Sequence, residues 1–295
     1  MAIKTVQAVI NGSTYNLVYD SGQGAWIATF TAPGATSFNL PGGYYNVQIT
    51  ARNDAGTTTE IDGALNEGCR LKVKETIKPV ITVQSPTDGA FVTNNQQPIV
   101  FNIIDEAGGS GININSLEVK IDSEAVTEGI KSTTITNGYS VTVTPQAALG
   151  EGLHSVTINC KDNDGNAAIT KTTSFTVDTV PPTLNITSPA EGLITAEKTV
   201  NVIGTTNDST SSPTTVTVNG ASVTVNPNGS FTHAFSLNDG LNTITVVATD
   251  SAGKKTTIVR HVTLNSKIPK IESVTITPNP ANTGASMVLK VVVSE

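Results

Sequence analysis

The chain has 295 residues, a length that allows two or three domains of about 100 residues, each with its own core. Only 14% of the residues are charged and 4% are aromatic, and Thr, Val, Asn, Ser and Gly are frequent, a composition typical of strands joined by tight turns that leaves little room for long helices. The formal net charge is −7 and Lys and Arg are not clustered, which excludes a nucleic-acid partner, because binding to phosphates requires concentrated positive charge.

Neither a secretory signal nor a membrane span is predicted. The first residues, Met-Ala-Ile-Lys-Thr-Val-Gln, enter a strand pattern directly, without a basic segment followed by a continuous apolar one. No stretch approaches the roughly 18 to 20 apolar residues that a spanning helix needs. We therefore expect a protein made in the bacterial cytoplasm, with no membrane insertion.

One strand-and-turn pattern occurs three times, in residues 43–56, 152–165 and 240–253, which align without gaps. Apolar residues recur at every second position, so each set is expected to share the core face of one strand. The glycine that ends each copy is expected to adopt a positive φ in the turn. The three predicted core sets are Val47, Ile49 and Ala51; Val156, Ile158 and Cys160; and Ile244, Val246 and Ala248.

A second repeat gives the domain boundaries. Residues 79–89 align with residues 182–192, and each copy follows a short linker, the second of which contains Asp-Thr-Val-Pro-Pro at 178–182. These repeats predict modules at 1–76, 79–178 and 181–266, followed by a partial module at 268–295. Cys69 and Cys160 fall in different modules and are expected to be free thiols.

Each module contains several segments of 5 to 8 residues with strand character, separated by Gly, Asn and Pro turns, and one helical turn is predicted at residues 145–149. Residues 149–166, residues 105–112 and the Asp-Thr-Val-Pro-Pro linker resemble bacterial immunoglobulin-like domains. The resemblance implies an all-β fold of tandem immunoglobulin-like antiparallel β-sandwiches. It is shared by adhesins, enzyme accessory domains and phage virion proteins, so fold alone leaves the function open.

The first module is predicted to lack its first two strands. Residues 10–12 and 24–30 align with residues 218–220 and 229–235 of the third module, and no length remains before residue 10 for strands A and B. Trp26 takes the position of Phe231 in this alignment, and we expect it to belong to the core rather than to a binding platform.

The C-terminal segment shows the converse pattern, because residues 268–295 resemble an A–B hairpin without the rest of a sandwich. An isolated hairpin is marginal in water, and an exposed apolar edge favours pairing. We hypothesise that the hairpin of one copy completes the first module of the next by strand addition, with Met1 and Glu295 as natural ends. A first module that stands alone with a frayed tail, and flanking domains outside this sequence, are the alternatives. The predicted assembly residues are Ile271, Val274, Ile276, Val288, Leu289, Val291 and Val293.

Catalysis has little support in the sequence. His154, His233 and His261 occur without a nucleophile motif or a metal-ligand spacing, and the first two are expected to point outward from strands. We expect no enzymatic activity and no cofactor other than calcium. The candidate calcium ligands are Asp162, Asp164 and Asn166, whose oxygens alternate around a Gly turn. The other interpretation is that such residues cap their own turn through backbone hydrogen bonds.

These observations predict a structural protein of a phage or phage-tail-like particle, because such a protein leaves the cell by lysis and needs no export signal. Its partners would be other copies of itself or other virion subunits. Host cell-surface carbohydrate is a further candidate partner, with the loops at 94–97 and 207–212 as contacts. The alternatives are a spacer from a secreted adhesin, at an extracellular or cell-surface location, and accessory modules of a polysaccharide-degrading enzyme.

Overall fold

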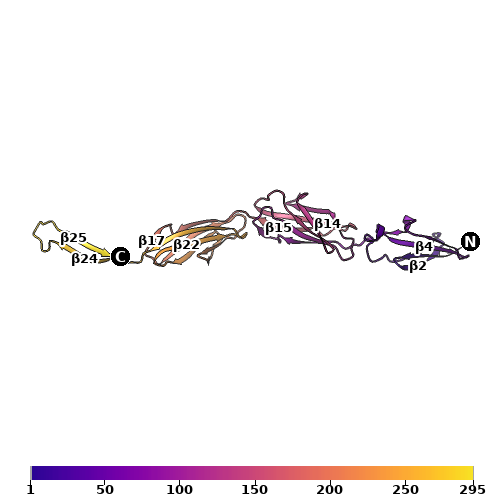
Figure 1. The fold of residues 1–295 in the computed structure, drawn as a ribbon, viewed down its shortest axis with the longest axis horizontal. Coiled ribbons are helices and arrows are strands. Elements are labelled where there is room, and N and C mark those ends of the chain that lie inside the picture. The colour runs from indigo at the N-terminus through magenta and orange to yellow at the C-terminus, as the bar shows by residue number, and fades with distance from the viewer. Residues whose placement is uncertain (1, 295) are drawn as a thin grey trace. The chain divides into compact units, whose positions relative to one another are not determined.

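Strands form nearly all of the regular structure in residues 2–294, which are the residues that the computed structural model describes (Figure 1). The chain divides between Val177 and Asp178 into two compact units. Strand pairing is antiparallel except at two short contacts, which confirms the predicted all-β class of antiparallel sheets. Within the described residues, no helix is long and apolar enough to cross a bilayer.

The first module contains one sheet, in the order β3-β2-β1-β4-β5, with β6 paired to β4. Short 3-10 helices span Pro41–Gly43 and Glu67–Cys69. No second sheet covers this one within the described residues. The strands are β1 (Ile3–Ile10), β2 (Ser13–Asp20), β3 (Ala25–Ile27), β4 (Tyr45–Asn53), β5 (Thr58–Ile61) and β6 (Arg70–Leu71).

The second module is a two-layer sandwich. One layer has the order β11-β10-β14-β15-β8 and the other β12-β13-β9-β7. Phe101, Phe175 and Ile158 are fully buried between the layers. The strands are β7 (Val80–Ser85), β8 (Ala90–Val92), β9 (Ile99–Ile104), β10 (Ile112–Ile121), β11 (Glu124–Ala125), β12 (Ile130–Ile135), β13 (Gly138–Val143), β14 (Gly152–Asp162) and β15 (Lys171–Val177).

The third module repeats this plan with its own core, which includes Val202, Phe231 and Val246. Its layers have the orders β16-β18-β21 and β17-β23-β22-β19-β20. The strands are β16 (Thr183–Ser188), β17 (Leu193–Thr195), β18 (Thr199–Asn207), β19 (Thr215–Val218), β20 (Ala221–Val223), β21 (Ser230–Ser236), β22 (Gly240–Thr249) and β23 (Lys255–Leu264).

The repeated strand is core-facing where a second layer covers it. Val156 and Ile158 on β14, and Ile244 and Val246 on β22, are completely buried, as predicted. Val47, Ile49 and Ala51 on β4 follow the same alternation but are only half-buried. The difference follows from architecture, because the first module has no described sheet opposite β4. Gly56, Gly165 and Gly253 all have positive φ, as predicted.

Three local predictions are wrong. Residues 145–149 form bends and extended chain rather than a helical turn. His154 is only 8% exposed, because it has the same parity on β14 as Val156 and points inward. His233 is likewise half-buried, because it alternates on β21 in step with Phe231 and Phe235.

Candidate functional site

Two clusters of three carboxylates occupy equivalent positions in the second and third modules. The first consists of Glu75, Asp105 and Asp162, and the second of Asp178, Asp208 and Asp250; within each cluster, the nearest oxygens all lie within 4.8 Å of one another. We call them the second-module cluster and the third-module cluster.

Each position follows from the shared fold. The first member precedes by four residues the proline that opens the module, Pro79 or Pro182. The second member directly follows β9 or β18, and the third lies at the C-terminal end of the repeated strand, β14 or β22. Strands β9 and β14 belong to opposite layers, so the ends of both layers and the preceding linker converge on one spot.

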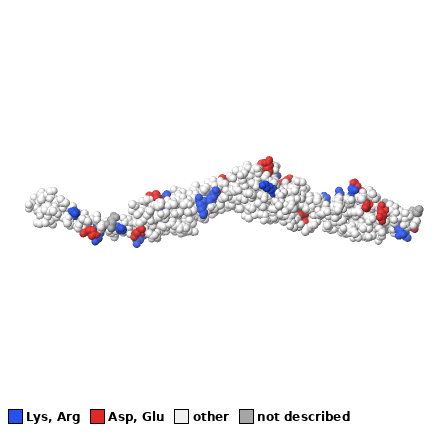
Figure 2. All heavy atoms as spheres, viewed as in Figure 1, with Lys and Arg blue, Asp and Glu red and all other residues white. Residues whose placement is uncertain are grey.

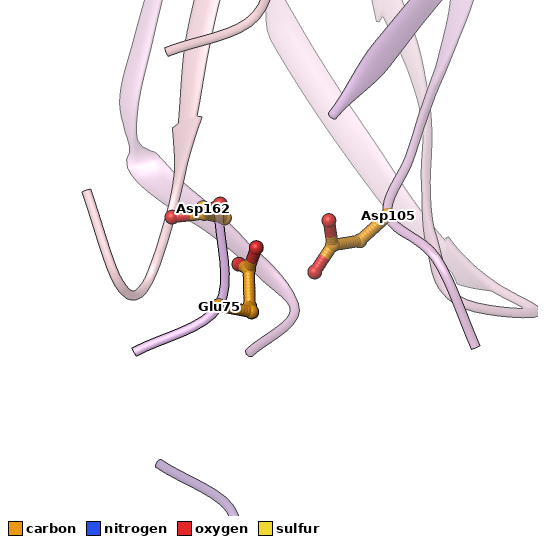
Figure 3. A group of neighbouring side chains, drawn as sticks. All are labelled: Glu75, Asp105 and Asp162. Atoms are coloured by element: carbon orange, nitrogen blue, oxygen red, sulfur yellow. The ribbon is translucent and has the colours of Figure 1, made fainter. Parts of the chain in front are cut away.

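In the second-module cluster, Asp105 is 3% exposed and Asp162 is 1% exposed. The backbone N–H of Gly111 donates to Asp105 Oδ2 at 2.7 Å, whereas the buried Asp105 Oδ1 has no hydrogen-bond partner. Figure 3 shows the Asp105 carboxylate directed toward those of Glu75 and Asp162. Ser110 Oγ donates to Glu75 Oε1 at 3.2 Å.

Two carboxyl groups in or beside this cluster have raised pKa values. Burial and the adjacent Asp162 carboxyl raise the pKa of Glu75 to about 7. Burial and the neighbouring Asp105 carboxyl also raise the pKa of Glu106, whose Oε2 is buried without a partner. No Lys, Arg or His side chain among residues 2–294 forms an ion pair with these carboxylates.

In the third-module cluster, Asp178 is fully buried and Asp250 is 6% exposed. One oxygen of each, Asp178 Oδ2 and Asp250 Oδ2, is buried and has no hydrogen-bond partner. The backbone N–H groups of Thr210 and Ser211 donate to Asp208 Oδ1 at 2.8 and 2.7 Å. The hydroxyl of Ser211 is also buried and unpartnered, whereas Asn207, Ser209 and Ser212 of the predicted contact loop at 207–212 are exposed.

Only one of the three predicted calcium ligands belongs to a cluster. Asp164 turns toward the first module, where its Oδ2 accepts hydrogen bonds from Thr36 Oγ1 and the backbone N–H of Glu75. Asn166 lies beside the cluster, because its Nδ2 donates to Asp162 Oδ2 at 2.7 Å. Sequence reasoning missed Glu75 and Asp105, which are far from Asp162 in the chain.

The turn-capping interpretation is confirmed in all three modules. The residue at the equivalent position accepts a hydrogen bond from the backbone N–H four residues later in every case. The bonds are Thr57 N to Asn53 Oδ1 at 3.0 Å, Asn166 N to Asp162 Oδ1 at 2.8 Å, and Lys254 N to Asp250 Oδ1 at 2.8 Å. Capping uses one oxygen, so the second oxygen of Asp250 stays available for another role.

The terminal hairpin of β24 (Lys270–Thr277) and β25 (Val288–Ser294) exposes a second kind of candidate site. Every described residue of both strands is exposed. The register pairs Val274 with Val291 and Ile276 with Leu289, and Ile271 and Val293 lie on the same side, giving one apolar face. Val288 pairs with Thr277 on the opposite face, so it does not belong with the other six predicted assembly residues. Met1 and Glu295 lie outside the described residues.

The first module presents an apolar recess on its sheet. A cavity of about 470 Å³ is lined mainly by apolar residues, among them Ala8, Ile10, Leu17, Trp26, Val47 and Ile49, together with Arg70 and Lys72. Trp26 is half-buried and lies next to Tyr19, at 5.7 Å between ring centroids. Its strand, β3, pairs with β2, whereas the aligned β21 of the third module pairs with β18 in the other layer. We attribute this difference to the absence of a described β18 equivalent in the first module.

The buried histidine forms an ion pair that is a feature of module stability. His154 Nδ1 lies 2.6 Å from Asp122 Oδ2, and Nε2 lies 2.9 Å from the Gly150 carbonyl oxygen. Burial opposes protonation, but the Gly150 carbonyl and the Asp122 carboxylate outweigh it and raise the pKa of His154 above its usual 6.5. A doubly protonated ring satisfies both acceptors.

We predict that this pair stabilises the second module in mild acid. Because the folded-state pKa is raised, the contribution is complete below the unfolded pKa of about 6.5 and disappears as the pH rises through the folded value. Asp122 has a lowered pKa and remains ionised in this window. In urea unfolding, His154→Gln should cost about 1–2 kcal/mol at pH 5.5 and progressively less toward pH 9. A pH-independent difference would contradict the assignment.

Charged groups elsewhere are sparse. On the face shown in Figure 2, Lys, Arg, Asp and Glu appear singly or in small mixed groups, without an extended basic patch. Cys69 and Cys160 are both buried and free, as predicted.

Two families match the two sandwiches. Residues 78–179 match the family described as bacterial Ig-like domain, and residues 182–266 match glucodextranase, domain B. The second and third modules are tandem immunoglobulin-like domains. A relative of this tandem protein, bacillopeptidase F of Bacillus subtilis (strain 168), is 25% identical over 230 residues. The match covers 75% of the chain, which spans only 15% of the length of that relative.

Solved structures similar to this tandem protein are modular as well. The fibronectin(III)-like modules of Clostridium thermocellum CbhA match with a TM-score of 0.39 and 18% identity, over 63% of this chain and 94% of theirs. The tetra-tandem repeat from the extending region of a large adhesion protein matches with a TM-score of 0.31 and 17% identity, over 98% and 79%. These similarities concern the fold.

Proposed function

We propose that the chain is a non-enzymatic structural protein that assembles head to tail through its terminal hairpin. The observation that carries this proposal is the pair of apolar surfaces described above. One is the six-residue face of β24–β25, whose members are 46% to 64% exposed. The other is the recess on the sheet of the first module.

The second and third modules supply the precedent for such packing. In the second module, β7 and β9 pair antiparallel, with Ile81 opposite Ile103 and Val83 opposite Phe101, and this strand pair covers the sheet that contains β14. The β24–β25 hairpin has the same antiparallel pairing and a comparable apolar face. A hairpin laid on the sheet of the first module would therefore restore the two-layer arrangement.

The contact joins two different surfaces, so it is heterologous and produces a ring or a filament. If the contact is repeated from copy to copy, the modules of successive copies form a regular array. This supports our proposal that the protein belongs to a phage or phage-tail-like particle, with other virion subunits or host surface carbohydrate as partners. An adhesin spacer, or accessory modules of a polysaccharide-degrading enzyme, at an extracellular location is the alternative. Fractionation of the source bacterium distinguishes them, because a virion component co-purifies with particles released by lysis.

Solution mass tests the assembly directly. Light scattering over a concentration series should give a mass that rises with concentration for the wild-type chain, and the monomer mass for Val291→Asp, which places a charge on the apolar face. Thr275→Asp is the matched control, because Thr275 lies in the same hairpin on the opposite face, paired with Lys290. It should assemble as the wild type does. A wild-type chain that stays monomeric at every concentration, or a Val291→Asp chain that still assembles, would refute the proposal.

A further inference from the structure

We propose that the second-module and third-module clusters are two Ca²⁺ sites, each of which ties the segment preceding a module to the loops of that module. The inference is independent of head-to-tail assembly. It rests on the geometry of the carboxylates, on their unpartnered oxygens and on their repetition.

Without a cation, both clusters are electrostatically unfavourable. Three carboxylates converge within 4.8 Å in each cluster, and four of the six residues are more than nine-tenths buried. Burial weakens solvation and strengthens repulsion between like charges, and no basic side chain among the described residues pairs with them. A bound divalent cation converts this repulsion into attraction.

Both clusters contain carboxylate oxygens that make no hydrogen bond. Buried polar atoms in folded proteins are nearly always satisfied. Here Asp105 Oδ1 in one cluster, and Asp178 Oδ2 and Asp250 Oδ2 in the other, are buried and unpartnered, although the second oxygen of each carboxylate is held by a backbone N–H. The backbone therefore fixes each carboxylate and leaves one oxygen free to bind a cation.

The same arrangement of acidic residues occurs in both complete sandwiches. Glu75, Asp105 and Asp162 correspond position by position to Asp178, Asp208 and Asp250 in modules with different core residues. The first module has Asn53 at the position of Asp162 and Asp250, and the described residues show no cluster there. The acidic residues thus occur together where a linker enters a complete sandwich.

The donor set identifies the ion. All ligating groups are oxygens, which favours a hard cation over the transition metals that prefer imidazole or thiolate. Ca²⁺ accepts six to eight oxygens in irregular geometry, whereas Mg²⁺ requires a near-octahedral shell and retains several waters. Buried, unpartnered groups beside each cluster, Glu106 Oε2 in one and Ser211 Oγ in the other, offer additional oxygens.

Bound Ca²⁺ would act on the linkers. Glu75 lies between β6 and β7, and Asp178 lies between β15 and β16. The remaining ligands lie at or directly after the C-terminal ends of β9 and β14, or of β18 and β22. An ion held by all three ligands fastens each linker to the module that follows it, and its removal would free the linker.

Calorimetric titration of the full chain with Ca²⁺ after chelation tests the proposal. We expect two ions per wild-type chain, one for Asp105→Asn, one for Asp250→Asn and none for the double variant. Asp54→Asn is the matched control, because Asp54 is exposed in the equivalent turn of the first module, where the described residues show no cluster, and it should still bind two. Far-UV circular dichroism of each variant establishes that it is folded.

A second measurement does not depend on the variants. Limited proteolysis of the wild-type chain should cut within residues 72–79 and 178–182 at least tenfold faster in chelator than in Ca²⁺, and excess Mg²⁺ should not substitute. Fewer than two bound ions per wild-type chain, or undiminished binding by the double variant, would overturn the proposal. Equal cleavage with and without Ca²⁺ would overturn the role of the ion in holding the linkers.

Discussion

Replacing Phe101 with Ala is expected to lower the free energy of unfolding of the second module by about 3–5 kcal/mol, the usual cost of deleting a buried aromatic side chain. Phe101 is completely buried on β9, between Val83 on β7 and Val141 on β13. The transition of the third module should not move, because that module has a separate core. Urea unfolding followed by hydrogen exchange of residues in each module measures both quantities.

Phe91→Ala provides the control, because the Phe91 side chain on β8 is 38% exposed and leaves a smaller void. Its cost should be well below that of Phe101→Ala. Equal shifts in both modules after the Phe101 substitution would show that the two sandwiches unfold as one cooperative body, contrary to the separate cores.

Replacing Gly229 with Ala is expected to destabilise the third module by about 2–5 kcal/mol. Gly229 has a φ of +81°, and a Cβ added there would overlap the carbonyl oxygen of Thr206. That overlap lies where β18 meets β21, because the N–H of Thr206 donates to the carbonyl oxygen of Gly229 at 2.9 Å. The backbone strain and the steric overlap therefore add.

Gly220→Ala separates these two contributions. Gly220 has a similar φ of +84°, but no atom lies within 4 Å of the position of its added Cβ. Its substitution should cost only the backbone term of about 1–2 kcal/mol. Thermal unfolding of both variants gives the comparison, and equal costs would contradict a steric contribution at Gly229.

The sandwich fold was predictable because its signal is local. Alternation of apolar residues in 152–165 and 240–253 places Val156 and Ile244 in cores, and the structure buries both completely. His154 and Asp162 are each an even number of positions from Val156, so the same alternation places them on the inward side of β14. The polar character of histidine led to the opposite prediction for His154. Alternation along β25 would also have placed Val288 on the face opposite to Leu289, Val291 and Val293.

The acidic clusters were not predictable from spacing. Glu75, Asp105 and Asp162 are brought together by pairing between strands far apart in sequence, and no short motif contains two of them. The available signal was the alignment itself, because acidic residues recur at 75 and 178, and at 162 and 250, in otherwise divergent repeats. The pairing of β3 with β2 was equally hidden, since it depends on which neighbouring strands are present.

The two parallel contacts in the sheets have a mechanical consequence. Strand β8, near the start of the second module, runs parallel to β15, its last strand, and β17 runs parallel to β23 in the third module. When tension is applied to the two ends of such a module, it pulls these strands past each other along their length. The interstrand hydrogen bonds are then loaded together rather than broken one at a time, so each module should yield to stretching only at high force.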